Sequence, residues 1–581
     1  MAVSFQLLDD IETFLEKEKE EYLKEQQFKD FYSIYISERK KVDDLFYSFF
    51  RKEGLDIEEG SWVEVKSDNM SMFASLWFSE KKGFYLITEE PIPFNNVKIA
   101  EADALQLVLM QEKALKFFRE SEAGSSIVLR NIICNLSRYS VRAPKEFYFL
   151  NAHLNDSQKR AVQNAVNLSQ NDPFYLIHGP PGTGKTTVIT EIVRQLNRFG
   201  KKVLITSHTN VAVDNVMENI FPDLGSVSVR LGLRSKVTPQ LRKLVPTKDE
   251  EILHLKVDKI VGATLSKVSM LVMTGKINWE NPFFDYVIID ESSMATIPLT
   301  LVGLLCGKMF ILVGDQKQLP PITKTESNDL QRYIRDKRAY ESLFGLLIET
   351  HPQKSTMLDV QYRSHPDIIE FSSKQFYEGR IKSDRQCHQR ILQLERRIQN
   401  EKIPGILNTK PLVCIDSSRF NPEGWIQKSH FGEYSFFNEY EAAIALAVRD
   451  DLLRSGIKKG QISIITPFSI QRQVIRNAVR KKYGQNEEDD VLSIEDLTAA
   501  TVDSFQGKER DCIIFCITWV HRNKKQGLPK ALKDWRKLNV ALTRPKKKMI
   551  IVGAISEFTE FPYSALHYFL KDKGSIVRAP K

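Results

Sequence analysis

The chain has 581 residues, of which 42% are hydrophobic and 27% are charged, the balance of a globular protein with large cores and roughly three or four domains. Its formal charge of +9 permits a polyanionic partner but fits an ordinary solvated surface equally well. No apolar run approaches the ~20 residues of a membrane span, and the six cysteines have neither a C-x-x-C pair nor zinc-ligand spacing, which excludes a membrane-spanning helix and a zinc module.

The N-terminal part is predicted to frame a small β-barrel between helical segments. Apolar residues recur at helical spacing from Leu7 to Leu15, and an aromatic stripe continues to Phe50, so we expect residues 5–50 to form a long helix or a helix pair. From Trp62 the pattern favours short strands, and residues 102–119 return to helical spacing. Barrels of this size often bind nucleic acid, but a purely structural module is an equal alternative. The expected strands are 62–65, 72–78, 84–88 and 96–99.

From residue 150 the sequence alternates between strand, polar loop and helix, which is typical of a parallel α/β sheet that presents a site at its carboxyl edge. Residues 225–262 are predicted to be a short basic insertion. Its basic residues are Arg230, Arg234, Lys236, Arg242 and Lys243. The expected strands are 175–177, 202–206, 284–289 and 309–313.

A phosphate-binding loop, G-x-x-x-x-G-K-[ST], lies between the first of these strands and a predicted helix over residues 188–199. Glycines let the backbone curl so that several N–H groups point at one phosphate chain, and the helix N-terminus adds its positive dipole end. Lys185 should reach the β- and γ-phosphates, and Thr186 should bind Mg²⁺ through its hydroxyl. The nucleotide-binding residues of this loop are Gly179, Pro180, Pro181, Gly182, Thr183, Gly184, Lys185, Thr186 and Thr187.

The strand–helix alternation returns in the last third of the chain, without a second phosphate loop. A second sheet that lacks its own loop suggests one nucleotide held between two similar domains. Residues 383–402 are predicted to form a charged amphipathic helix, an insertion with no assigned role. The expected strands are 412–415, 462–465, 512–517 and 549–552.

Candidate catalytic residues follow the strands of both regions. Asp290 can bind Mg²⁺ beside the nucleotide, and Glu291 can orient or deprotonate the attacking water. Gln316, after the next strand, can sense the γ-phosphate. Arg363 and Arg544 could reach a γ-phosphate from a neighbouring domain, an effect worth ~10³–10⁵ in rate. Taken alone, each arginine fits a surface residue better, so the assignment depends on the whole set.

This ordered set of motifs resembles the superfamily 1 helicases, specifically the up-frameshift-like group of superfamily 1B. The resemblance extends over residues 154–555, and the preceding region is similar, less specifically, to the family's helical stalk and accessory β-barrel. The matching segments are 154–158, 179–187, 207–214, 262–264, 290–293, 314–321, 358–366, 501–509 and 538–544.

The resemblance implies roles at the matching positions. Gln158 would read the adenine edge, Tyr362 would stack on the base and Glu509 would hold the ribose. The γ-phosphate would be contacted by Gln316, Arg363 and Arg544. The residues near the nucleic-acid backbone would be Ser207, Thr209, Asn210, Thr264, Thr501 and Ser504, for each of which helix capping or turn hydrogen bonding is a serious alternative. Family members move 5′ to 3′ along single strands, and the resemblance implies that polarity here.

The fold class expected on these grounds is α/β, with two tandem RecA-like parallel-sheet domains, an N-terminal helical stalk and a small accessory β-barrel. The expected domains are 1–52 (helical stalk), 53–145 (accessory β-barrel and returning stalk helix), 146–335 (RecA-like, with the phosphate loop and the Asp-Glu motif) and 336–581 (RecA-like, with the arginine fingers).

The expected function is that of an ATP-dependent helicase or translocase on single-stranded DNA or RNA, driven by Mg²⁺-ATP hydrolysis in the cleft between the two RecA-like domains. We expect a monomeric motor with no membrane partner. Because the N-terminus lacks the apolar region of a signal peptide, we expect it to be intracellular, in the cytoplasm or, in a eukaryote, the nucleus. The sequence does not indicate protein partners.

Two other functions agree less well with the sequence. A phosphate-loop kinase or GTPase needs an acceptor pocket or an N-K-x-D motif, and the sequence shows neither. A nucleic-acid-binding scaffold with a decayed ATPase conflicts with the intact Lys185, Asp290, Glu291 and Arg544. The chain departs from the family at Pro545, where alanine is usual, and it lacks a zinc-binding regulatory module and any nuclease or iron–sulfur cysteine pattern.

Overall fold

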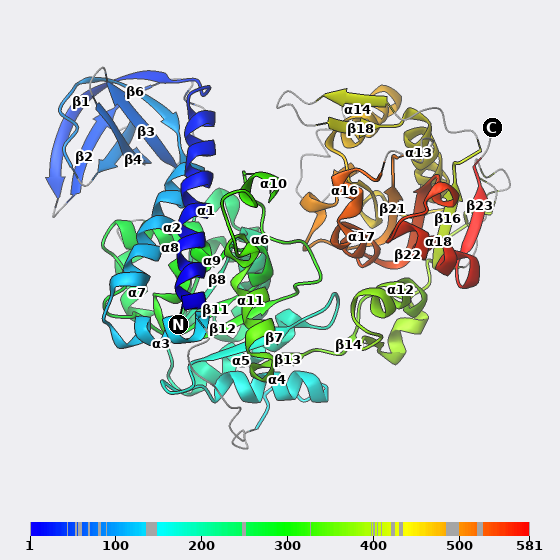
Figure 1. The fold of residues 1–581 in the computed structure, drawn as a ribbon, viewed down its shortest axis with the longest axis horizontal. Helices are drawn as coiled ribbons and strands as arrows, with labels where there is room; N and C mark the ends of the chain where they lie inside the picture. Colours follow the sequence, from blue (N-terminus) through cyan, green and yellow to red (C-terminus); the bar gives the residue numbers. More distant parts are fainter. Residues whose placement is uncertain are drawn as a thin grey trace. The chain divides into compact units, whose positions relative to one another are not determined.

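The structure is a computed structural model in which the chain forms two compact units (Figure 1). The first comprises Met1–His178, Lys185–Gln316 and Pro320–Thr356, and the second comprises Gly179–Gly184, Lys317–Leu319 and Met357–Lys581. Across the described part of the chain, no helix is long and apolar enough to cross a membrane. The described residues are 2–42, 45–52, 55, 61–67, 70–79, 83–88, 90–134, 148–246, 251–325, 327–396, 398, 401, 403, 405–407, 410–419, 425–428, 434–483, 499–519 and 527–579.

The first unit begins with a long helix and a closed six-stranded barrel. Helix α1 (Ala2–Gln26) buries Ile11 and Phe14 against α2 (Asp103–Glu120), and α3 (Gly124–Ile133) completes this helical layer. The barrel has the strand order β1-β2-β5-β4-β3-β6. Its strands are β1 (Tyr32–Val42), β2 (Leu45–Phe50), β3 (Trp62–Ser67), β4 (Met70–Ser79), β5 (Gly83–Thr88) and β6 (Asn96–Glu101).

The prediction of helix over residues 5–50, and with it the all-helical stalk domain 1–52, is wrong beyond Gln26. In β1 the buried Ile34 and Ile36 flank Tyr35, which is exposed, and this period of two is that of a strand with one face in a core. The aromatic residues beyond Gln26 therefore belong to the barrel, whereas the four strands predicted after Trp62 are confirmed with small shifts at their ends.

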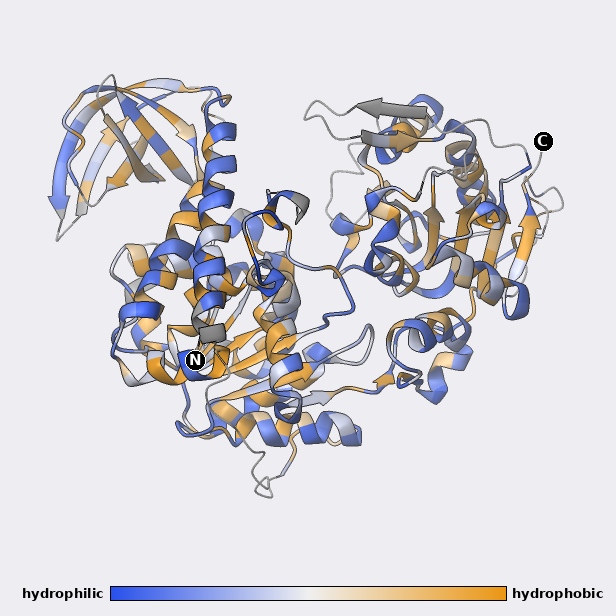
Figure 2. Cartoon of the chain, viewed as in Figure 1, coloured by the Kyte–Doolittle hydropathy of each residue, from blue (hydrophilic) through white to orange (hydrophobic). Residues whose placement is uncertain are grey.

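The rest of the first unit is built on a seven-stranded sheet of order β13-β7-β12-β11-β8-β10-β9. The five strand pairings that join β7, β12, β11, β8, β10 and β9 are all parallel. Figure 2 shows these strands largely in the colour of hydrophobic residues, as expected for a sheet covered on both faces. The strands are β7 (Phe174–His178), β8 (Val203–Ser207), β9 (Ser228–Leu231), β10 (Ile260–Thr264), β11 (Phe284–Ile289), β12 (Gly307–Gly314) and β13 (Ser355–Met357). The helices are α4 (Asp156–Val166), α5 (Lys185–Arg198), α6 (Asn210–Leu224), α7 (Glu251–Val257), α8 (Leu265–Met273), α9 (Ile297–Leu304), α10 (Ser327–Leu330) and α11 (Leu343–Thr350).

The segment 225–262, predicted to be a short basic insertion, contributes strands to the sheet. Its strands β9 and β10 pair in the sheet, and all four residues of β9 are buried. Arg230, one of the basic residues of the predicted insertion, is fully buried and forms an ion pair with Asp214. Strand β9 was not predicted from the sequence because one of its four residues is Arg230, and a charged residue does not indicate a buried strand.

The second unit contains a six-stranded sheet of order β20-β19-β21-β22-β16-β23, in which all five pairings are parallel. The strands are β16 (Leu412–Asp416), β19 (Ile462–Thr466), β20 (Ala499–Thr501), β21 (Arg510–Cys516), β22 (Pro545–Gly553) and β23 (Ser575–Arg578), with two short ladders of β14 (Val360–Gln361) with β15 (Lys382–Ser383) and β17 (Trp425–Lys428) with β18 (Tyr434–Phe437). The helices are α12 (Pro366–Phe376), α13 (Glu439–Arg454), α14 (Ser469–Tyr483), α16 (Lys530–Lys533), α17 (Trp535–Leu542) and α18 (Tyr563–Asp572).

Two further predictions, for residues 383–402 and for the domain boundary at residue 336, are wrong. The described residues of 383–402 form the end of β15, a short 3₁₀ turn over Arg385–Gln389 and loops rather than an amphipathic helix, because Cys387 alone is buried in that turn. The predicted domain boundary at residue 336 also lies too early, since Leu343 and Phe344 of α11 pack into the core of the first unit, which continues to Thr356. The coarse fold class, α/β with parallel sheets and a small barrel, is confirmed.

Candidate active site

The phosphate loop joins β7 to α5, as predicted. Gly182 and Gly184 have φ angles of +74° and +85°, a region that glycine alone adopts without strain. The Thr183 hydroxyl donates to the Pro180 carbonyl at 2.7 Å and closes the turn. Helix α5 begins at Lys185, so the loop leads into a helix N-terminus, where the backbone N–H groups and the helix dipole favour an anion.

An acidic pair lies where β11 ends. Asp290 is 5% exposed and accepts a hydrogen bond from the Glu291 backbone N–H at 2.8 Å, while its own N–H donates to the Thr206 carbonyl of neighbouring β8 at 3.0 Å. Glu291 has a left-handed backbone, with φ of 50°, and its Oε1 lies 3.6 Å from the Lys185 ammonium. The structure therefore brings together the phosphate-loop lysine and both predicted carboxylates.

The electrostatics of this pair suit a bound cation. Burial and the neighbouring Glu291 carboxylate raise the pKa of Asp290, and the Lys185 charge only partly opposes them. A metal ion beside Asp290 would supply the positive charge that the burial of this carboxyl lacks. Two buried acceptor atoms also lack a hydrogen-bond partner among the described residues, Glu291 Oε2 and Gln316 Oε1. Asp290, with Thr186 at the start of α5, fits a hydrated Mg²⁺ ion, which prefers oxygen ligands and retains several waters.

Sequence reasoning missed a second layer of polar residues behind the loop. His178, the last residue of β7, lies 3.0 Å from Asp315 Oδ1, and the Asp315 backbone N–H donates to the Ser293 hydroxyl at 3.2 Å. The signal was present, because His178 and Gly314 are register partners on adjacent parallel strands and Asp315 directly follows Gly314. These contacts fix the ends of β7 and β12 on either side of the phosphate loop.

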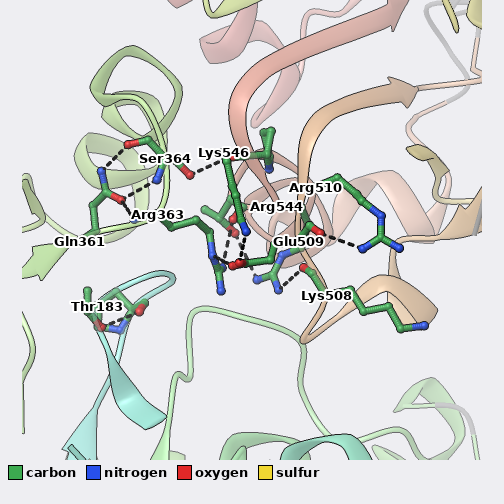
Figure 3. A network of polar contacts seen from close by, with 12 residues as sticks. Thr183, Gln361, Arg363, Ser364, Lys508, Glu509, Arg510, Arg544 and Lys546 are labelled. Atoms are coloured by element: carbon green, nitrogen blue, oxygen red, sulfur yellow. Dashed lines mark hydrogen bonds and ion pairs between the residues drawn. The ribbon is translucent and has the colours of Figure 1, made fainter. Parts of the chain in front are cut away.

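In the second unit, a glutamine and a tight turn orient Arg363. Figure 3 shows that Gln361 Oε1 accepts hydrogen bonds from the backbone N–H groups of Arg363 and Ser364, both at 2.8 Å. The Tyr362 N–H donates to the Gly182 carbonyl at 2.8 Å, and a Cβ atom on Gly182 would lie 2.5 Å from that of Arg363. Gly182 must therefore be glycine for a second reason, because the turn that carries Arg363 lies directly against it.

Arg363 is held by an acidic residue. Its Nε donates to Glu509 Oε2 at 2.5 Å and its Nη1 donates to the Thr543 carbonyl at 3.3 Å. The other Glu509 oxygen lies 2.6 Å from the Lys546 ammonium (Figure 3). Glu509, predicted to hold a ribose, thus has both oxygens engaged by cations in this structure.

Arg544 is more deeply enclosed. It is 2% exposed, its Nε donates to the Val540 carbonyl at 3.1 Å and its Nη2 donates to Gln318 Oε1 at 3.0 Å. Pro545, the departure from the family, is the first residue of β22, a position at which a proline costs no ladder hydrogen bond. The backbone after Arg544 therefore enters the sheet at Pro545, and the ladder of β22 with β21 shifts register before Lys548.

Several residues assigned by resemblance have a local structural role. Gln158 forms a capping box with Asn155 at the start of α4, and Thr209 and Thr264 cap α6 and α8. Thr501 and Ser504 hydrogen-bond to each other across a turn. Capping was the stated alternative for such hydroxyl groups, and it does not prevent contact with a ligand. Buried Ser207 Oγ, in contrast, has no partner among the described residues.

Two of the predicted nucleic-acid-binding residues line one cavity of about 490 Å³ in the first unit, namely Asn210 and Thr264. Trp62 and His208 line it too, as do the basic residues Arg234, Lys236 and Lys267. Burial lowers the pKa of His208, which keeps its imidazole neutral near neutral pH. The cavity thus combines amide, hydroxyl, aromatic and cationic groups, and the contribution of Trp62, distant in sequence, was not evident from any motif.

A parallel sheet, a phosphate loop opening a helix and a lysine beside two strand-end carboxylates together define a nucleoside-triphosphate-binding protein of the phosphate-loop class. Two family models described as "AAA domain" match this chain, one over residues 153–252 and 234–326 and the other over residues 339–556. Together they cover both parallel sheets except β23.

Comparison with named relatives identifies the family, within the phosphate-loop class, to which the chain belongs. The uncharacterized ATP-dependent helicase MJ0104 of Methanocaldococcus jannaschii is 31% identical over 532 residues, 76% of this chain and 74% of that protein. Two relatives from Saccharomyces cerevisiae are each 31% identical to this chain. The DNA replication ATP-dependent helicase/nuclease DNA2 matches 80% of the chain, and the ATP-dependent helicase NAM7 matches 81%. The chain belongs to the up-frameshift-like family of superfamily 1 helicases. It spans only 30% of the length of the DNA2 relative and 49% of the NAM7 relative.

Proposed function

We propose that this chain is an ATP-driven motor that moves along single-stranded nucleic acid and separates duplexes. The observation that carries the proposal is the lysine–carboxylate arrangement of the phosphate-loop unit, with Lys185 3.6 Å from Glu291 and buried Asp290 adjacent. Family membership adds the reaction class, because the relatives are named ATP-dependent helicases.

Each residue has a role in the proposed hydrolysis. Lys185 and the loop N–H groups bind the phosphates, and Asp290 and Thr186 hold Mg²⁺, which neutralises charge on the phosphate oxygens when bound. Glu291 takes the proton of the attacking water through its unpartnered Oε2. Gln316 orients that water or the γ-phosphate, and Arg363 stabilises the charge that develops there.

The finer architecture is part of the proposal. We assign the two parallel sheets to tandem RecA-like domains, with α1 and α2 as the stalk and β1 to β6 as the accessory barrel. Closure of the two domains on ATP would supply Arg363 and Arg544 to the triphosphate. Gln158 and Tyr362 would bind the adenine, and each hydrolysis cycle would shift the grip on the strand.

The proposed track is single-stranded DNA or RNA, followed from 5′ to 3′. Its contacts are the residues assigned by resemblance together with the cavity that contains Asn210, Thr264 and the three basic side chains. The relatives' names include both DNA replication and nonsense transcripts, so they do not favour one nucleic acid. Backbone contacts of this kind carry affinity with little base identity.

The test is ATP hydrolysis measured with and without single-stranded DNA and RNA, followed by unwinding of 5′- and 3′-tailed DNA, RNA and hybrid duplexes. We expect stimulation by at least one strand type and unwinding of 5′-tailed duplexes only. The Lys185→Ala variant is the matched inactive control. If neither nucleic acid stimulates hydrolysis by the folded wild-type chain, the proposed function is wrong.

A further inference from the structure

Trp62, the first residue of β3, is a large aromatic residue that lies outside the core of the barrel. The next residues of the strand, Val63 and Val65, are fully buried inside the barrel. Because alternate residues of a strand point to opposite faces, Trp62 lies on the outer face, where it is partly exposed. Strand β3 contacts α2 there, and α2 contacts α8 (Figure 1). Trp62 belongs to none of the segments that match the family motifs.

The backbone of Trp62 is fixed to the start of α2. Its N–H donates to Asp103 Oδ1 at 2.6 Å, and its carbonyl accepts the Ala102 N–H at 2.7 Å. Burial raises the pKa of Asp103, whereas the hydrogen bond from Trp62 and the charge of Lys236 oppose that rise. The indole is therefore carried by an ordered joint between barrel and helix, which lowers the entropy cost of using it to bind a ligand.

Trp62 lines two cavities of the first unit. One is the cavity of about 490 Å³ described above, and the other has a volume of about 880 Å³. Gln106 and Met110 of α2 also line both, so the two cavities adjoin along this helix. A ligand in either cavity would meet the indole of Trp62.

The two cavities differ in charge. The charged residues of the smaller cavity are Asp103, Arg234, Lys236 and Lys267, which give a formal net charge of +2. The larger cavity is lined by five glutamates, two lysines and one arginine, a formal net charge of −2. A polyanion is attracted to the first and repelled by the second. The charges thus select the smaller cavity as the one in which a nucleic acid strand meets Trp62.

We propose that Trp62 is a stacking platform for one base of a single strand bound in the smaller cavity, whose phosphates are held by Arg234, Lys236 and Lys267. The proposal rests on the proposed function, because it takes the track to be single-stranded nucleic acid. An aromatic ring stacks on any base, and cations beside it bind the backbone without reading sequence. The barrel, for which nucleic-acid binding and a purely structural role were equal alternatives, thus contributes directly to binding.

The alternative is that Trp62 only packs the barrel against α2. Packing accounts for an aromatic residue at this joint, but it does not require cations, and three of the four charged residues around the smaller cavity are basic. The two roles also differ in what they predict. A packing role affects every strand equally, whereas stacking affects only strands that carry bases.

The test measures the affinity of the full chain, without nucleotide, for two short DNA single strands of equal length. One strand carries adenine throughout and the other is abasic throughout, so the two have the same phosphates and differ only in their bases. RNA strands of the same design replace them if the wild type binds RNA alone.

Trp62→Ala should weaken binding of the adenine strand by roughly 5–100-fold, the range for loss of one stacked base. Its affinity for the abasic strand should stay within about twofold of the wild type, because the phosphate contacts remain. Trp62→Phe keeps an aromatic ring and should retain most of the affinity for adenine. Tyr35, 57% exposed on β1, is the aromatic control, and Tyr35→Ala should bind both strands as the wild type does.

The salt dependence of binding tests the cations. Each lost phosphate contact should reduce the slope of log affinity against log salt concentration by ~0.7 for a single strand. Arg234→Met and Lys236→Met should each show this reduction with both strands, because both strands carry the phosphates. Lys116→Met also removes one positive charge, but Lys116 is exposed and lines the larger cavity, so this control should keep the wild-type slope.

Equal losses of affinity for the adenine and abasic strands in Trp62→Ala would assign Trp62 a structural role, and unchanged affinity for both would place base stacking elsewhere. Wild-type salt slopes in both Arg234→Met and Lys236→Met would remove the phosphates from this cavity. Each of these results overturns the inference and leaves the proposed function intact. If the wild-type chain bound no single strand of either nucleic acid, the proposed function would fail and the inference with it.

Discussion

The buried ion pair between Arg230 and Asp214 predicts a large, local loss of stability when one partner is removed. Arg230 is fully buried, donates from Nε to Asp214 at 2.7 Å, and also donates to the Leu231 carbonyl and to Asn210 Oδ1. An Arg230→Met substitution keeps most of the apolar volume but leaves the Asp214 carboxylate buried without a counter-charge. Breaking a buried pair in this way costs about 3–5 kcal/mol.

The cost should be much smaller when both charges are removed together. In Arg230→Met with Asp214→Asn, the amide oxygen still accepts the Thr238 N–H that now bonds to Asp214 at 2.9 Å, and no charge remains buried. We expect the double variant to be more stable than Arg230→Met alone by at least ~1 kcal/mol. Because the chain forms two compact units, a single free energy of unfolding does not describe the whole chain. The variants must therefore be compared with a probe of the region around Arg230.

Thermal unfolding and hydrogen exchange provide that comparison. For a unit of this size we expect the transition of Arg230→Met to fall by roughly 4–7 °C, and exchange to accelerate in β8, β9 and β10. Nucleic-acid affinity should fall as well, because Asn210 loses the donor that orients it. This account of the pair would be refuted if Arg230→Met lowered the free energy of unfolding by less than ~1 kcal/mol. It would also be refuted if the effects of the two single substitutions simply added up to that of the double variant.

The remaining predictions concern the nucleotide site. Lys185→Ala should abolish ATP binding in a fluorescence or calorimetric titration, whereas Glu291→Gln should bind ATP normally and hydrolyse it more than ~100-fold more slowly; normal turnover would remove Glu291 as the base. Burial and the Glu291 carboxylate raise the folded-state pKa of Asp290 from 3.8 to about 7, so ionisation of this carboxyl destabilises the fold increasingly as pH rises from about 4 to about 7. Asp290→Asn should therefore gain thermal stability relative to wild type across that pH range, while it loses Mg²⁺-nucleotide binding. An advantage of Asp290→Asn that shrank with pH would contradict the sign. Gln158→Ala should raise KM for ATP but not for GTP, and an equal rise for both would indicate that Gln158 only caps α4.

The strands and the phosphate loop could be predicted because their residues carry the signal themselves. Strands such as β7 and β11 are mostly apolar, and the polar residues at their carboxyl ends coincide with the edge of a parallel sheet. The glycines at 182 and 184 are similarly local, since the loop conformation requires them. Such features need no knowledge of the rest of the fold.

Other features depend on partners that are distant in sequence. Whether Arg230 lies on the surface or in the core depends on Asp214, 16 residues earlier in α6. The ion pair of Glu509 is with Arg363, which lies 146 residues before it. The helix expected beyond Gln26 failed because barrel closure, which pairs β1 with β6, overrides a stripe of aromatic residues whose spacing fits either structure.

The nucleotide site combines several features that cost stability in the protein alone. Glu291 has a left-handed backbone that costs roughly 1–2 kcal/mol in a residue other than glycine, buried Asp290 has an unfavourable charge, and the oxygens of Glu291 and Gln316 lack partners among the described residues. A chain selected for stability alone would place glycine at 291 and an amide at 290. In the proposed function, Mg²⁺ and a triphosphate would offset these costs together, because the metal would satisfy the Asp290 carboxylate and an ordered water would bond to the oxygens of Glu291 and Gln316. Nucleotide binding should therefore stabilise the first unit by more than the phosphate contacts alone provide, and it should make the carboxyl ends of β7 and β11 more rigid.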